Sequence, residues 1–252
     1  MNITQYLQRI KYDGIISPII TTLNALQKNH LLNVPFENLD IHYGRVIVLN
    51  VSKFFEKVVI EKRGGFCYEL NGLFFELLQS MGFEVKMVSA RVYNGTEKTY
   101  SPEYDHLAII VKINSTLYLA DVGFGEFTLQ PLKIELNEVQ KDERGNFKIQ
   151  QHDDEYLMVA KQVNDDWIPE YIFSTRERAL SEFTEMCIYN QTSPQSHFTQ
   201  KKLCSIATDG GRITLTTDLL KISGPNVSTL EKIDSEEAFA VRLEQYFYIK
   251  MS

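Results

Sequence analysis

A cysteine follows two glycines in the stretch KRGGFCYELNGLFFELLQSMG, residues 62–82. The apolar residues after it recur at helical spacing, which predicts that Cys67 lies in the first turn of a helix. Free cysteine is often simply buried, but unpaired N–H groups and the helix dipole favour a thiolate at this position. The same amides can bind a developing oxyanion, and Gly64 and Gly65 keep the approach free of side chains. These features make Cys67 a candidate nucleophile.

A thiol nucleophile needs a base, and the base needs a group that orients it. The stretch DHLAIIVKINSTLYLADVG, residues 105–123, is typical of a β-hairpin. A loop at 113–114 places His106 directly opposite Asp121, and a loop at 114–115 makes them diagonal neighbours. Both registers put the two side chains on one face of the hairpin, whereas a loop with an odd number of residues separates them.

The face that His106 and Asp121 share is otherwise apolar, with Ala108, Ile110, Leu117 and Leu119. An acid buried there needs a partner, and the imidazole is the obvious one. Each residue also has a plainer interpretation, because a histidine at a strand start is commonly a surface residue and an aspartate can anchor a turn. A cysteine at a helix start together with a paired histidine and aspartate nevertheless favours a triad of Cys67, His106 and Asp121.

Three consecutive modules are expected to position these residues. The first, residues 1–82, has helical patterns at 3–10, from Pro18 to before Pro35, at 52–62 and from Cys67 to Gly82. The second, residues 83–184, has strand patterns that predict a curled antiparallel sheet or barrel, at 83–94, 106–113, 116–124, 155–163 and 166–174. The third, residues 185–252, is expected to be mixed α/β, with a loop-rich stretch at 189–203, three strands and a last helix at 235–249.

Composition limits the function classes. The chain has 252 residues, a formal charge of −7 and the proportions of apolar and charged residues typical of a soluble globular protein. The acidic balance argues against general binding to nucleic acid or to a membrane surface. Three widely spaced cysteines predict neither a disulfide framework nor a metal site. The polar N-terminal stretch lacks the apolar segment of a signal peptide, so we expect a cytoplasmic location.

Four stretches together resemble the arylamine N-acetyltransferases. They are VPFENLDIHYG (34–44), RGGFCYELNGLF (63–74), DHLAIIV (105–111) and LADVGFG (119–125), and they occur in the family's order. The resemblance covers the first half of the chain most closely. It implies an α+β fold of the papain and transglutaminase type, with an N-terminal helical bundle, a central antiparallel β-barrel and a C-terminal α/β lid.

The resemblance also implies roles for single residues. By motif position, Cys67 is the nucleophile, His106 the base and Asp121 its orienter. The family pairs the arginine of the RGG motif with the glutamate of the PFEN motif, which are Arg63 and Glu37 here. The GFG segment after the acid lines the acyl and coenzyme site, so Gly123, Phe124 and Gly125 are expected there, with Phe66 and Phe124 as an aromatic wall.

The reaction implied by the family is acetyl transfer from acetyl-CoA to the nitrogen of an arylamine, arylhydrazine or similar amine, as in xenobiotic metabolism. It follows a ping-pong course through an acetyl-cysteine. The expected partners are therefore coenzyme A and a small amine, without metal, nucleic acid or membrane, and the oligomeric state is left open. Lys201, Lys202 and Arg212 are possible partners of the coenzyme phosphates.

Other reactions remain compatible with the same three residues. A thioester hydrolase or a transglutaminase-like enzyme passes the acyl group to water or to a protein lysine. An amide synthase takes a different acyl donor, such as a carrier-bound chain. A binding protein keeps the fold without turnover, although intact Cys67, His106 and Asp121 count against that class.

Overall fold

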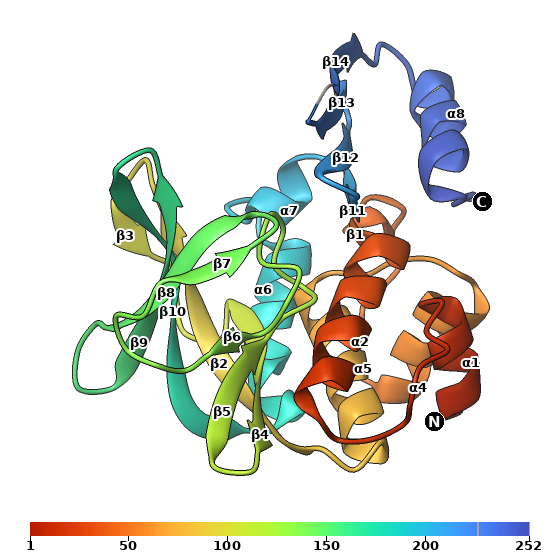
Figure 1. The fold of residues 1–252 in the computed structure, drawn as a ribbon. Coiled ribbons are helices and arrows are strands. Elements are labelled where there is room, and N and C mark those ends of the chain that lie inside the picture. Colours follow the sequence, from red (N-terminus) through yellow and green to blue (C-terminus); the bar gives the residue numbers. More distant parts are fainter. Residues whose placement is uncertain (226, 252) are drawn as a thin grey trace.

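A computed structural model describes residues 1–225 and 227–251 of the chain. Helices gather in the N-terminal region, a strongly curled sheet stands beside them, and a second sheet with a covering helix completes the molecule (Figure 1). Every helix within these two ranges is too short or too polar to cross a lipid bilayer.

The N-terminal region is helical as predicted, with α1 (Ile3–Arg9), α2 (Ile20–Asn33), α3 (Leu39–His42), α4 (Val51–Phe55), the π-helical turn η1 (Glu56–Ile60) and α5 (Cys67–Ser80). Helix α2 begins later than the predicted Pro18, because Ile19 still has an extended backbone. The helix predicted at 52–62 changes to π-helical geometry halfway. Gly82 follows α5 with a φ of +86°, a left-handed conformation that glycine adopts without strain.

Helix α5 is the centre of the largest core. Its first eight residues are all buried, together with Leu77 and Leu78 in the following turns. These side chains pack against Leu107, Ile109 and Val111, which form one face of a barrel strand. Because fully burying one such side chain contributes about 1.5–3 kcal/mol, this packing holds the helix that begins at Cys67 firmly against that strand.

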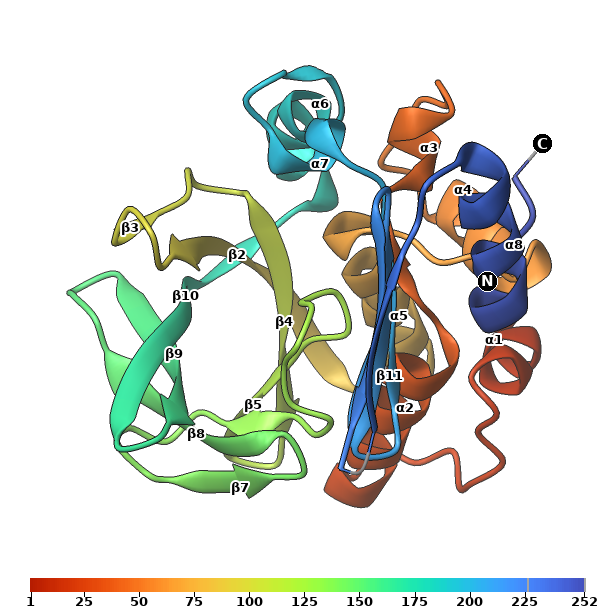
Figure 2. The same ribbon diagram turned by 90° about the horizontal axis from the view of Figure 1, so that it is seen from above.

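The second region is a nine-stranded antiparallel sheet with β2 (Glu84–Asn94), β3 (Thr99–Tyr100), β4 (His106–Ile113), β5 (Thr116–Ala120), β6 (Leu132–Lys133), β7 (Gln140–Asp142), β8 (Gly145–Gln151), β9 (Tyr156–Val163) and β10 (Asp166–Arg178). The order is β6-β5-β4-β2-β10-β9-β8-β7, with β3 added to β2. Figure 2 shows these strands curling round on one side of the molecule. The predicted strands are present, but β5 ends at Ala120, so Asp121 lies just beyond it.

Side chains draw the two edge strands of this sheet together. The amide of Gln140 in β7 accepts from the backbone N–H of Lys133 at 2.7 Å and donates to its carbonyl at 2.8 Å. Asp142 accepts from the N–H groups of Leu129 and Gln130 at 3.1 Å. These contacts satisfy backbone groups that a sheet edge leaves unpaired, and they nearly close the barrel.

The C-terminal region contains η2 (Leu180–Phe183), α6 (Thr184–Thr192), α7 (His197–Gln200), β11 (Leu203–Thr208), β12 (Gly211–Thr216), β13 (Leu219–Gly224), β14 (Val227–Lys232) and α8 (Glu236–Phe247). The stretch predicted as loop-rich at 189–203 contains the end of α6 and all of α7, with loop residues between and after them. The sequence does not predict the helix α6 there, because α6 is mostly polar and buries only Cys187 and Asn190. Ser196 caps α7 by accepting from the N–H of Phe198.

The C-terminal sheet is completed by a strand from the other end of the chain. Its order is β1-β11-β12-β13-β14, where β1 (Phe36–Glu37) pairs antiparallel with β11. Figure 2 shows this sheet edge-on between the barrel and α8. On the face that α8 covers, the sheet contributes Cys204, Leu215 and Leu220 to a core with that helix. The other face of the sheet lies toward the barrel.

Candidate active site

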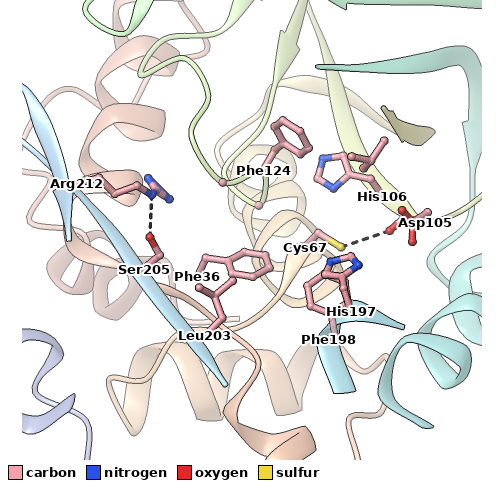
Figure 3. A pocket seen from close by; sticks show the side chains of 13 residues that line it. Phe36, Cys67, Asp105, His106, Phe124, His197, Phe198, Leu203, Ser205 and Arg212 are labelled. Atoms are coloured by element: carbon pink, nitrogen blue, oxygen red, sulfur yellow. Dashed lines mark hydrogen bonds between the residues drawn. The ribbon is translucent and has the colours of Figure 1, made fainter. Parts of the chain in front are cut away.

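A pocket of about 220 Å³ lies where α5, the barrel and the C-terminal sheet meet (Figure 3). Its lining includes Cys67 from α5, His106 and Phe124 from the barrel region, Phe198 from α7 and Arg212 from β12. An apolar protein cavity of about 150 Å³ holds benzene. The pocket therefore has room for one substituted aromatic ring beside the thiol.

Cys67 is the first residue of α5 and is only 3% exposed. Its Sγ lies 3.8 Å from the carbonyl oxygen of Asp105. Burial raises the pKa of the Cys67 thiol well above its usual range, and the Asp105 carboxylate raises it further, whereas a backbone hydrogen bond from Leu107 lowers it. The helix N-terminus alone therefore does not outweigh burial, and a thiolate here needs a cation beside it.

His106 and Asp121 meet across the hairpin in the diagonal register. Strands β4 and β5 pair Ile113 with Thr116, so the loop is Asn114–Ser115. His106 Nε2 lies 2.7 Å from Asp121 Oδ2, and both residues are buried. Ala108, Ile110 and Leu119 surround the pair on the barrel's inner face, as the alternating pattern predicts.

Two residues that the sequence did not single out complete the surroundings of Asp121. Asn71 Nδ2 donates to Asp121 Oδ1 at 2.8 Å, and the Tyr171 hydroxyl donates to Oδ2 at 3.1 Å. The N–H of Gly123 also donates to Oδ1, at 2.9 Å. Asn71 lies one turn after Cys67 on a buried helix face, and a fully buried amide in an apolar stripe is the signal that identifies it. Tyr171 begins the buried part of β10, and its neighbours in the sequence do not distinguish it from an ordinary core residue.

Gly123 lies against the backbone of the nucleophile helix. A β-carbon at this position lies 2.8 Å from Cys67 Cα and 2.8 Å from Asn71 Nδ2, so only glycine fits. Gly123, Phe124 and Gly125 all line the pocket, and the Phe124 ring lies 5.3 Å from the His106 ring. The segment that contains Asp121 thus packs directly against the turn that contains Cys67.

The expectation that Phe66 forms part of the pocket wall is not met. Phe66 is fully buried behind the pocket, edge-on to Tyr68 at 5.0 Å and to Phe198 at 6.0 Å. As the N-cap of α5, its side chain points into the helical core instead of along the Cys67 side chain. The aromatic wall consists of Phe36, Phe124 and Phe198, which all line the pocket.

Arg63 and Glu37 belong to a buried cluster of five charged residues behind the nucleophile. Arg63 Nη2 lies 2.8 Å from Glu37 Oε1, and Nη1 lies 2.6 Å from Asp40 Oδ1. Lys57 Nζ lies 2.8 Å from Asp40 and 2.9 Å from Glu69. Glu69 Oε2 also accepts from the N–H of Phe66 at 3.1 Å. The cluster therefore connects the β1 segment to the residue just before Cys67.

We expect an Arg63→Met variant to lose about 3–5 kcal/mol of unfolding free energy, because it leaves Lys57 as the one cation of the cluster for three buried carboxylates. Urea unfolding measures this loss. The control is Lys112→Met, which removes one partner of an ion pair whose side chains are 46% and 70% exposed, and it should change stability little. Equal losses in the two variants would contradict the structural role of the buried cluster.

The three cations considered for coenzyme phosphates lie in different places. Lys202 pairs with Glu236 and lies over the rings of Tyr43 and Phe239, and it does not line the pocket. Lys201 is exposed and also lies outside the lining. Only Arg212 of the three lines the pocket.

Comparison with known proteins identifies the family of the chain. A family model described as N-acetyltransferase matches residues 19–252. The arylamine N-acetyltransferase of Mycolicibacterium smegmatis is 36% identical over 220 residues, which are 85% of this chain and 80% of the relative. The arylamine N-acetyltransferase of Escherichia coli K12 is 33% identical over 216 residues, 85% of this chain and 76% of the relative.

Solved structures show the same fold. The arylamine N-acetyltransferase from Salmonella typhimurium superimposes with a TM-score of 0.91 at 27% identity, over 97% of this chain and 90% of that chain. The Mycobacterium marinum enzyme in complex with CoA gives 0.89 at 29% identity, over 98% and 93%. The α+β fold predicted from the sequence is confirmed, and the chain belongs to the arylamine N-acetyltransferase family of enzymes.

Proposed function

We propose that this protein transfers the acetyl group of acetyl-CoA to the nitrogen of an arylamine or arylhydrazine through an acetyl-cysteine on Cys67. The observation that carries the proposal is that Cys67 and His106 line one apolar pocket and that His106 is paired with Asp121. A related enzyme of the family has been solved with CoA, which supports acetyl-CoA as the co-substrate. In this proposal, residues 1–82 supply the nucleophile, residues 83–184 the base and its orienter, and residues 185–252 a wall of the pocket.

In the first half-reaction, His106 takes the proton of the Cys67 thiol. Its Nε2 is bound to Asp121, so Nδ1 is the nitrogen that receives the proton, and the imidazolium is the cation that the buried thiolate needs. The sulfur attacks the thioester carbonyl of acetyl-CoA. The bond between the acetyl carbon and the coenzyme sulfur then breaks, and the coenzyme thiolate takes the proton from His106.

In the second half-reaction, the neutral amine attacks the acetyl carbon of acetyl-Cys67. His106 accepts a proton from the amine nitrogen and returns it to the leaving Cys67 sulfur, so the free enzyme is restored and the acetamide is released. Phe36, Phe124 and Phe198 make the pocket apolar. Such walls disfavour water relative to a flat aromatic amine, and they support aminolysis over hydrolysis.

The two half-reactions can be tested separately. Enzyme mixed with acetyl-CoA alone should release one equivalent of CoA and gain one acetyl group by intact-protein mass spectrometry. Addition of an arylamine should then remove the adduct and start turnover. Steady CoA release without amine would indicate a thioester hydrolase instead, and an adduct only with other acyl donors would indicate an amide synthase.

The role of His106 predicts a particular pH dependence for Cys67. Burial raises the pKa of the thiol, so without an imidazolium the sulfur stays protonated at neutral pH and reacts only as the pH rises. A His106→Gln variant should therefore react slowly with iodoacetamide near neutrality and progressively faster toward alkaline pH, whereas the wild-type protein reacts readily at neutrality. Mass spectrometry of the modified residue follows the rate. His152→Gln, which changes a histidine outside the pocket lining, should keep the wild-type profile, and a wild-type profile in His106→Gln would contradict the assigned base.

A further inference from the structure

Arg212 carries the only permanent positive charge among the described residues that line the pocket. It lies in β12 and is half-buried, and its Nε donates to the Ser205 hydroxyl on the neighbouring strand at 2.8 Å. Ser205 in turn contacts the Thr214 hydroxyl at 2.7 Å, so its position is held by the sheet. This hydrogen bond leaves the two terminal nitrogens of the guanidinium as the donors available to the pocket (Figure 3).

The guanidinium has no carboxylate partner of its own within residues 1–225 and 227–251. The acid that acts on it most, Glu126, is 70% exposed at its side chain and lies 3.9 Å from Lys161 instead. Burial lowers the pKa of Arg212 to about 10, and the nearby Arg144 adds to this effect. A cation held in an apolar pocket without a counter-charge is costly, and an anionic ligand removes that cost.

The two sides of the pocket carry charges of opposite sign. Figure 3 shows Arg212 and Ser205 on one side and Cys67, His106 and Asp105 on the other, with Phe36 and Phe124 between them. The carboxylate of Asp105 is near enough to raise the pKa of the Cys67 thiol, and its negative charge suits the developing positive charge of an attacking amine. The lining thus matches a flat molecule with an amine at one end and an anion at the other.

We propose that Arg212 binds the carboxylate of the acyl acceptor, which makes aminoaryl carboxylates the preferred class of amine. The inference rests on the acetyl transfer proposed above. A coenzyme phosphate is the other source of a negative charge, but the long pantetheine arm separates the phosphates from the thioester. Arg212 instead lines the same compact cavity as Cys67. Its planar fork can bind a carboxylate through two hydrogen bonds.

The test compares 4-aminobenzoate with its neutral analogue 4-aminobenzamide. In a ping-pong reaction, kcat/KM for the amine reports only the second half-reaction and kcat/KM for acetyl-CoA only the first. We expect Arg212→Gln to lower the ratio of kcat/KM for 4-aminobenzoate over 4-aminobenzamide by about 10- to 100-fold, the range for a hydrogen-bonded charge. Most of the change should appear in KM, and kcat/KM for acetyl-CoA should change much less. Arg212→Lys should restore part of the ratio, because it keeps the charge without the fork.

Controls separate this inference from the underlying chemistry. Lys221→Gln removes an exposed charge from the neighbouring strand β13 and should leave the ratio unchanged. If Arg212→Gln does not fold, Ser205→Ala, which frees Nε, should shift the ratio in the same direction by a smaller factor. An unchanged ratio, or a loss confined to acetyl-CoA, would overturn the assignment of Arg212. Failure of the wild-type protein to form an acetyl-enzyme would instead overturn the proposed function itself.

Discussion

A Cys67→Ser variant should form no acetyl-enzyme and should acetylate arylamines at least about 10⁴-fold more slowly than the wild-type protein. The hydroxyl that replaces the thiol is a far weaker acid, so it does not form an anion before the attack and is a much weaker nucleophile in a site that suits a thiolate. Serine is close to cysteine in size, and the buried packing of the first turn of α5 is retained. The loss should therefore appear in kcat while the folded structure persists.

Two measurements and a matched control establish this result. Intact-protein mass spectrometry after addition of acetyl-CoA detects the adduct, and urea unfolding checks the fold. Cys204→Ala changes another buried cysteine, which lies in the core on the α8 face of the C-terminal sheet, and it should keep the adduct. An acetylated Cys67→Ser protein with near-normal turnover would assign the nucleophile to another residue.

An Asp121→Asn variant should lower kcat by about 10⁴-fold, as when the acid of a related triad is replaced by an amide. Asp121 accepts four hydrogen bonds, from His106, Tyr171, Asn71 and the N–H of Gly123. An asparagine has only one acceptor oxygen, so its NH₂ group, which can only donate, takes the place of a carboxylate oxygen that accepts hydrogen bonds. The imidazole then turns to its other tautomer, and its Nδ1 can no longer take the proton of Cys67.

A control variant distinguishes lost chemistry from lost stability in Asp121→Asn. Asp142→Asn is a suitable control, because Asp142 also accepts backbone N–H groups but lies outside the pocket. Both variants should unfold at lower urea concentrations, yet only Asp121→Asn should lose kcat and neutral-pH alkylation of Cys67. Parallel losses of activity in the two variants would show that the effect of Asp121 is structural alone.

Much of the candidate site follows from local periodicity. The spacing of apolar residues after Cys67 predicts α5, and the alternation along the hairpin predicts that His106 and Asp121 share the inner face. Both patterns are properties of a single segment, in which helical or extended geometry decides where each side chain points. Local periodicity does not predict α6, because this polar helix has no apolar stripe.

The sequence by itself indicated most of the helices and strands, the order of the three regions and the candidates for nucleophile, base and orienter. Only the tertiary structure decided which distant segments meet at them. In that structure Phe66 is buried outside the pocket lining, whereas Phe36, Phe198 and Arg212 line the pocket. It also joins Asn71 and Tyr171 at Asp121. The physical reason is that these contacts depend on how α5, the barrel and the C-terminal sheet pack together, and no single segment carries that information in its own periodicity.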